Sequence, residues 1–188
     1  MQRREKKNEG EERGMRKERT LLVPIQLVHP FFFAECKELT VLEDELTYMN
    51  VSKPFIYEAA YFSGVQAVKP WETQEESIAC LLNEWQTVKE LLETLFGKRE
   101  IIHVLPLMKK GISLLLELVY WGNGLPVVLS NSLDESKLAI KPVNISERLE
   151  FIMQRPTLYH SYIQLAELIG EMNKQFVKQQ VLKKASKH

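Results

Sequence analysis

The chain has 188 residues, of which 45% are hydrophobic and 27% charged, a composition typical of a globular protein with one sizeable core. Its 25 Lys and Arg residues balance 25 Asp and Glu residues, so the formal net charge is zero. A neutral chain lacks the strongly basic footprint of a protein that binds nucleic acid with its whole surface. Eight glycines and eight prolines exclude collagen-like and low-complexity architectures.

Charge is unevenly distributed, because an acidic body separates two basic ends. Residues 1–19 carry eight Lys or Arg against five Glu, and residues 171–188 carry five Lys against one Glu. The first of these ends has almost no apolar side chains to bury, which predicts a disordered or frayed charged arm over residues 1–20. We expect a single helical domain over residues 21–180 and a basic tail over residues 181–188.

No segment predicts export or membrane insertion. The N-terminal residues mix basic side chains with Glu, unlike a signal peptide, and the apolar runs 21–34 and 101–121 are interrupted by Pro, His and charged or amide residues. Cys36 and Cys80 are too few for a disulfide framework. We expect two free, partly buried thiols in a cytoplasmic protein, with a Cys36–Cys80 disulfide as the minor alternative.

The first half of the chain predicts an extended segment followed by three helices. The extended segment covers residues 21–34, and a helix over residues 39–49 follows from leucines and a methionine at helical spacing. A short helix is predicted from Pro54 to Gly64. The clearest helix is Thr73–Phe96, whose apolar stripe runs over five turns behind a capping box of Thr73 and Glu76.

The second half predicts further helices around a less regular stretch. Residues 101–121 predict one helix, kinked or restarted near Pro106. It is apolar nearly all round from Ile112 to Trp121, so we expect it to be the most buried helix. Between residues 125 and 140 we expect a short strand at 126–129 and one helical turn at 132–138. A helix opened by a capping box of Asn144 and Glu147 ends at Pro156, and a long helix follows over residues 157–184. The fold class is therefore all-α, an irregular helical bundle of five to seven helices.

Compact catalytic and metal-binding motifs are absent from the sequence. There is no Cys-x-x-Cys, no His-Glu-x-x-His, no glycine-rich phosphate loop and no Gly-x-Ser-x-Gly. The four histidines have no ligand spacing: His29, His103, His160 and His188. The sequence therefore indicates no metal, no cofactor and no evident catalytic centre.

The polar segment 144–161 is the candidate ligand site. Arg148 and Arg155 lie seven residues apart on one helix face, near the start of the next helix. Two guanidinium groups beside free helix-start amides suit a phosphate or a carboxylate. The candidate residues are Asn144, Glu147, Arg148, Arg155, Tyr159 and His160. The alternative is that the two arginines and Glu147 form internal ion pairs that fasten the last two helices.

A longer pattern runs through this segment: Lys141-Pro-x-Asn-x-x-Glu-Arg-Leu-x-Phe-Ile-x-x-Arg-Pro-x-x-Tyr-His-Ser-Tyr-Ile-Gln-Leu165. It resembles the C-terminal signature of the YpoC-like family of small Gram-positive bacterial proteins. Pro30-Phe31-Phe32 is similar to the N-terminal part of that family, so the resemblance covers roughly residues 21–180. It implies a mainly helical domain and does not imply an activity.

Three functions stay open at this point. The favoured one is a helical interaction or accessory protein that binds a protein partner and is not an enzyme. A second is a DNA-associated accessory factor that contacts phosphates through its basic ends, including the lysines of residues 174–187. A third is a binder of a phosphate or carboxylate ligand at Arg148, Arg155 and His160.

Overall fold

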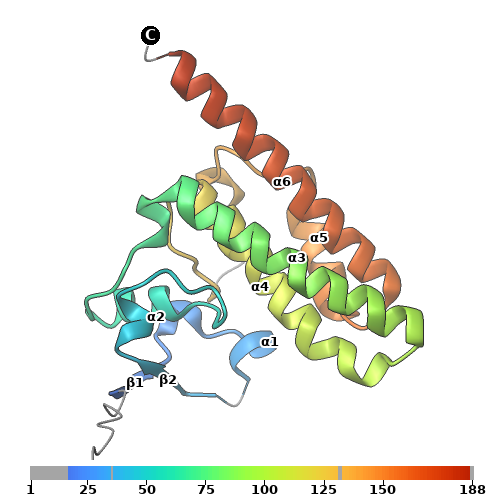
Figure 1. Cartoon of the computed structure of the whole chain (residues 1–188), viewed down its shortest axis with the longest axis horizontal. Helices are drawn as coiled ribbons and strands as arrows, with labels where there is room; N and C mark the ends of the chain where they lie inside the picture. The colour runs from blue at the N-terminus through green and yellow to red at the C-terminus, as the bar shows by residue number, and fades with distance from the viewer. Residues whose placement is uncertain (1–16, 35, 131–132, 187–188) are drawn as a thin grey trace, which may run out of the picture.

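The computed structural model describes residues 17–34, 36–130 and 133–186. Within these residues six α-helices and one two-stranded sheet are formed, which confirms the predicted all-α irregular bundle (Figure 1). The helices are α1 (Pro30–Phe33), α2 (Ile56–Phe62), α3 (Gln74–Lys98), α4 (Val104–Gly122), α5 (Ile145–Gln154) and α6 (Tyr159–Ala185). The strands are β1 (Glu18–Leu22) and β2 (Glu38–Leu42). No helix of the described residues is long and apolar enough to cross a membrane.

Helix α4 is the centre of the molecule, as its apolar character predicts. Every residue from Gly111 to Gly122 is buried, because α3 packs along one side of α4 and α6 along another, with α5 packed against α6 (Figure 1). Helix α6 extends past the start of α3, where Lys184 forms an ion pair with Glu75. Residues 181–185, which we expected in a basic tail, continue this helix.

Gly111 allows three helices to meet. A Cβ atom at this position would lie 2.9 Å from Trp85 of α3 and 2.9 Å from Leu165 of α6, closer than carbon atoms pack. Gly170 of α6, in contrast, has no atom within 4 Å of the corresponding position. The glycine in α4 therefore sets how closely its neighbours approach.

We expect Gly111→Val to lower the free energy of unfolding by about 1–3 kcal/mol, because overpacking forces buried side chains out of their rotamers. The same change in Gly170 is expected to stay within about 0.5 kcal/mol of wild type, since it meets open space. Urea denaturation of both variants measures the difference. Equal effects at the two positions would show that the close approach of Trp85 and Leu165 to Gly111 does not make a larger side chain more destabilising there.

The N-terminal part corrects two predictions. β1 pairs antiparallel with β2, with Leu21 opposite Leu39, so the helix predicted over residues 39–49 is wrong. The strand residues alternate, with Leu39 and Val41 turned inward between more exposed neighbours, and this period of two replaces the helical spacing. Of the charged arm predicted over residues 1–20, residues 1–16 lie outside the described residues, and residues 18–20 are part of β1.

Local details of the later elements also differ from expectation. The strand predicted at 126–129 is absent, and this stretch runs as irregular chain with Leu129 donating its N–H to Gln26 O at 2.7 Å. The helices after Thr73 and Asn144 form as predicted, but neither side chain makes the expected capping hydrogen bond. Both cysteines are free, as predicted. Cys80 is half-buried as expected, but Cys36 is exposed, so the prediction of a partly buried thiol is wrong there.

Two carboxyl groups are fully buried between α2 and α4. Glu58 Oε1 accepts the Trp121 indole N–H at 2.6 Å and the Val127 N–H at 3.3 Å. Glu117 Oε1 accepts the Phe55 N–H at 2.9 Å. The second oxygen of each carboxyl has no hydrogen-bond partner in the described part of the chain. Burial raises the pKa of Glu58 to about 7, and burial together with the charge of Glu58 raises the pKa of Glu117.

Candidate functional site

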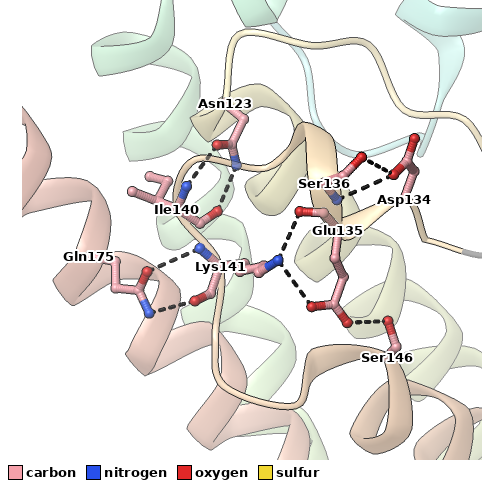
Figure 2. Close-up of polar contacts among 8 residues, drawn as sticks. All are labelled: Asn123, Asp134, Glu135, Ser136, Ile140, Lys141, Ser146 and Gln175. Atoms are coloured by element: carbon pink, nitrogen blue, oxygen red, sulfur yellow. Dashed lines mark hydrogen bonds and ion pairs between the residues drawn. The ribbon is translucent and has the colours of Figure 1, made fainter.

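The first residues of the signature fasten the loop between α4 and α5. The Gln175 side chain of α6 accepts from Lys141 N at 3.0 Å and donates to Lys141 O at 2.6 Å (Figure 2). Asn123 makes the same two-way contact with the main chain of Ile140, at 3.0 and 2.8 Å. The Lys141 ammonium lies 2.8 Å from the Glu135 carbonyl and 3.1 Å from its carboxylate. The side-chain amides of Asn123 and Gln175 thus satisfy the main-chain N–H and C=O groups of residues 140–141, which lie outside any helix or strand.

Glu135 connects this loop to the start of α5. Its carboxylate accepts a hydrogen bond of 2.6 Å from the Ser146 hydroxyl (Figure 2). The hydrogen bond from Ser146, and then that from Lys141, hold the pKa of Glu135 below its usual value. Lys141, the first residue of the signature, thus has a structural role before α5 begins.

Arg148 joins α5 to α6. Its guanidinium donates to Glu171 at 2.8 Å and to Glu167 at 3.3 Å, and also reaches Val143 O at 3.4 Å. The ion-pair interpretation therefore describes Arg148, although the partners are two acids of α6 and not the predicted Glu147. Glu147 is exposed, and no ion pair involves it in the described residues.

Arg155 and His160 lie elsewhere on the same pair of helices. The Arg155 guanidinium is exposed and lies 5.8 Å from the centre of the Phe151 ring. The His160 ring packs against the same phenylalanine at 5.7 Å, and its Nε2 lies 3.1 Å from the Gln164 amide. No acid pairs with Arg155 within the described residues. Asn144, with a left-handed φ of 52°, is also exposed. Of the six candidate residues, Arg148 fastens α5 to α6, whereas Asn144 and Glu147 are exposed at the start of α5. Arg155, Tyr159 and His160 lie at the exposed junction before α6.

The two arginines are expected to differ in their effect on stability. Arg148→Ala should lower the free energy of unfolding by about 1 kcal/mol, since it removes two charge-assisted hydrogen bonds that are partly shielded from solvent. Arg155→Ala should change it by less than about 0.5 kcal/mol, because the side chain is exposed and unpaired. Thermal and urea unfolding measure both. Unfolding of the Arg155 variant would instead assign this residue a structural role.

Tyr159, the remaining candidate residue, borders an open cavity. Its ring lies 5.3 Å from Phe96 of α3 in an edge-on arrangement. A cavity of about 580 Å³ opens there, and Glu93, Gly97 and Ile101 complete its lining. The α5–α6 junction therefore lies beside the connection from α3 to α4, at one end of the bundle (Figure 1).

Large apolar side chains are exposed around this cavity. Ile102 is 90% exposed and Tyr159 57% exposed, and the Tyr159 ring lies beside Phe96 and Tyr162. We call this patch the bundle-end surface; it comprises Phe96, Ile101, Ile102, Leu105, Leu158 and Tyr159. Contiguous exposed apolar groups of this kind mark interaction surfaces in proteins.

Basic side chains accompany both turns of the bundle-end surface. Lys98 and Arg99 come shortly before Ile101 and Ile102, with Glu100 between them, and Arg155 lies in the turn that leads to Leu158. None of the three forms an ion pair within residues 17–34, 36–130 and 133–186. Arg99 ends α3 in a left-handed conformation with φ of 59°. Three cations with no ion pair among the described residues thus accompany the apolar patch, and two acids lie near them, Glu93 in the cavity lining and Glu100 after Arg99.

Sequence reasoning missed the α3–α4 half of this surface. We predicted one helix over residues 101–121, kinked or restarted near Pro106. Instead Ile101–His103 is a 3-10 turn, and α4 begins at Val104, two residues before Pro106. Because Ile102 belongs to this short turn and not to α4, its side chain is exposed to solvent and is not part of the buried face of α4. The run Lys98-Arg99-Glu100 before the two isoleucines was the available signal, because Lys, Arg and Glu are almost never fully buried.

Together, the fold and these surfaces define a small helical-bundle protein; no group of three or more potential metal-ligating side chains is present among the described residues. The family model for YpoC-like protein matches residues 75–184. The chain is also 40% identical over 119 residues to the uncharacterized protein YpoC of Bacillus subtilis (strain 168), which covers 61% of this chain and 71% of the relative. No solved structure matches.

The chain therefore belongs to the YpoC-like family, as the signature indicated. The matched residues include α3 to α6 except the first residue of α3 and the last of α6, and thus the whole bundle-end surface. The matched family region begins at residue 75, so the Pro30-Phe31-Phe32 stretch that resembled the family lies outside it.

Proposed function

We propose that the protein is a helical interaction module whose bundle-end surface binds an acidic, apolar segment of a partner protein. The observation that carries this proposal is the exposure of Tyr159 at a cavity of about 580 Å³ and of Ile102 next to the lining residue Ile101, near cations that have no ion-pair partner in the described residues. Aromatic and arginine side chains at the centre of an interface commonly supply most of its binding energy.

The chemistry of the surface specifies the partner. An apolar side chain can enter the cavity between Phe96 and Tyr159, and burial of Ile102 removes apolar area from water. Carboxylates next to that side chain would pair with Lys98, Arg99 and Arg155. Complementary charge fixes orientation and speeds association, whereas a basic segment would be repelled. The proposal thus requires one segment that is both apolar and acidic.

Arg155, Tyr159 and His160 belong to this proposal as residues of the interface or its border. The small-ligand alternative needed Arg148 and Arg155 to converge on one anion. Arg148 is engaged by Glu167 and Glu171, so a protein surface is favoured over a phosphate or carboxylate pocket at this junction.

Site-specific photo-cross-linking tests the proposal in the native host. A benzophenone amino acid at Ile102 is expected to capture one protein, with the cross-link in a segment rich in Asp or Glu and apolar residues. Ile25 is the matched control, since it is 73% exposed but lies in the N-terminal part of the chain. The same product is expected to disappear when Arg99→Glu and Arg155→Glu are combined.

Three results would contradict the proposal. They are the absence of any specific product from Ile102, the same products from Ile25 and Ile102, and capture of a basic segment or a nucleic acid. Circular dichroism of the doubly substituted protein distinguishes a loss of binding from a loss of fold.

Nucleic acid is the alternative partner that the basic ends predict. Helix α6 exposes Lys174, Lys178 and Lys183, and no ion pair is formed by these three in the described chain. DNA binding that falls steeply with salt and disappears when residues 1–19 and 173–188 are removed would favour this alternative. Binding that does not depend on salt, or no DNA binding, would exclude it.

A further inference from the structure

A second cavity lies in the N-terminal part of the molecule, where no residue of the bundle-end surface contributes. It encloses about 370 Å³ between α1, β2, the segment before α2 and the first turns of α4. Figure 1 shows α1 and β2 on the same side of α4. The apolar lining consists of Phe32, Phe33, Leu39, Pro54, Phe55, Ile56 and Pro106. This volume falls within the range of pockets that hold small organic ligands.

The aromatic wall of this cavity is preformed. Phe55 has a φ of 61°, a left-handed conformation that is costly for a residue with a bulky side chain. The buried Glu117 carboxyl holds it there by accepting the Phe55 N–H at 2.9 Å. The Phe55 ring in turn packs edge-on against Phe32 at 5.2 Å. Strained backbone held by a buried acid is a feature that recurs at binding sites.

Three lysines line the same cavity, and two of them are already neutralised. Lys53 pairs with Glu45 at 2.8 Å. Lys110 donates to the carbonyl oxygens of Val51 and Ser52 and lies 3.4 Å from the Glu84 carboxylate.

Lys109 is different from these two. Its ammonium lies 5.3 Å from the centre of the Phe31 ring and pairs with no acid within the described residues. A half-buried ammonium over an aromatic ring beside an apolar cavity is able to pair with an incoming anion. The cavity therefore offers an apolar interior and one available positive charge.

We propose that this cavity binds a small amphipathic carboxylate, with its aliphatic or aromatic body among Phe32, Phe55 and Ile56 and its carboxylate on Lys109. One free cation fits one negative charge, which favours a monoanion over a phosphate ester of higher charge. The site is independent of the proposed protein interface, and either can fail without the other.

Titration with decanoate, followed by calorimetry and by amide chemical shifts, tests this assignment. Decanoate is expected to bind saturably and to shift the signals of Phe32 and Phe55. Decanol, which has the same chain length without the charge, is expected to bind at least about tenfold more weakly, the ratio given by about 1.4 kcal/mol. Lys109→Glu is expected to weaken decanoate binding by a similar factor, whereas Lys174→Glu on α6 should leave it unchanged.

A cavity-filling substitution provides the second arm. Leu39→Trp places a larger side chain from β2 in the cavity and is expected to abolish decanoate binding. Leu22→Trp is the matched control, because Leu22 lies on the partner strand β1 and is 69% exposed. If Leu39→Trp does not fold, the comparison of Lys109→Glu with Lys174→Glu decides alone. Non-saturable binding, equal binding of decanol, or no effect of Lys109→Glu would overturn the proposal.

Discussion

The free energy of unfolding is expected to fall as the pH rises from about 5 to about 8. Glu58 is fully buried, and its folded-state pKa of about 7 lies above the ordinary value of 4.5. Between these values the folded protein binds more protons than the unfolded chain, so raising the pH favours unfolding. A difference of this size corresponds to roughly 3 kcal/mol for Glu58 alone. The raised pKa of Glu117 acts in the same direction.

Glu58→Gln isolates this contribution. The glutamine oxygen can still accept hydrogen bonds from Trp121 and Val127, but the side chain cannot ionise. Urea denaturation between about pH 5 and pH 8 should therefore show a clearly flatter pH dependence for this variant. Burial lowers the pKa of His29, which opposes the trend, so the comparison between wild type and variant is the informative quantity. Equal slopes for the two proteins would contradict the assignment to Glu58.

Acids on the surface act in the opposite sense at lower pH. The pKa values of Glu43, Asp134 and Glu135 are held below their ordinary values, chiefly by hydrogen bonds from Lys17, Ser136 and Ser146 respectively. Their contribution is present above the unfolded-state pKa and is lost as the pH falls through the folded-state value. The pH range over which this contribution is lost therefore lies below the range in which Glu58 titrates. The free energy of unfolding is expected to be largest near pH 5.

Ile102→Asp is expected to weaken binding of the cross-linked partner segment by about thirtyfold or more. Removing a central apolar anchor costs about 2 kcal/mol, and a carboxylate there also repels an acidic partner. The unfolding free energy should change by less than about 0.5 kcal/mol, since Ile102 is almost fully exposed. Calorimetric titration of the variant with the partner segment measures the affinity, and urea denaturation measures the free energy of unfolding.

Charge reversal makes this expectation specific. Arg99→Glu should also weaken binding, and a partner segment in which the facing acid is replaced by Lys should restore it. Ile25→Asp is the matched control, because it adds the same charge to an exposed isoleucine outside the bundle. Equal loss of affinity from Ile25→Asp and Ile102→Asp would show that binding does not depend on the bundle-end surface.

The sequence predicts the helical bundle well because its long helices have strong apolar periodicity. The stripe of α3 and the nearly continuous apolar run of α4 both correspond to buried faces. The antiparallel pair of β1 and β2 was missed because Leu39, Leu42 and Leu46 satisfy helical spacing. The conformation of β2 is instead fixed by its pairing with β1. Such long-range pairing has no local signature in five-residue strands.

The partners of the candidate residues in the signature were not predictable from the sequence. Arg148 meets two acids of α6 that lie 19 and 23 residues away in sequence, a contact that depends on the crossing of α5 and α6. Glu147, the acid next to it in sequence, is turned outward. Tertiary packing therefore decides which of the two interpretations applies to each arginine.

The buried acids illustrate a second limit of sequence reasoning. Glu117 occurs within an apolar run, where an acid is expected to weaken the prediction of a buried helix. Its partner is the main-chain N–H of Phe55, 62 residues away, which becomes available because Phe55 is left-handed. A backbone conformation of this kind at a non-glycine residue has no marker in the sequence.

An isoleucine methyl NMR titration tests the central claim most directly, since isoleucines occur both on and off the bundle-end surface. With the protein labelled at isoleucine methyl groups, addition of the partner segment should shift and broaden the signals of Ile101 and Ile102. The exposed Ile25 and the buried Ile78 of α3 should be unaffected. Changes at Ile25 without changes at Ile101 and Ile102 would contradict the claim that this end of the bundle binds the partner.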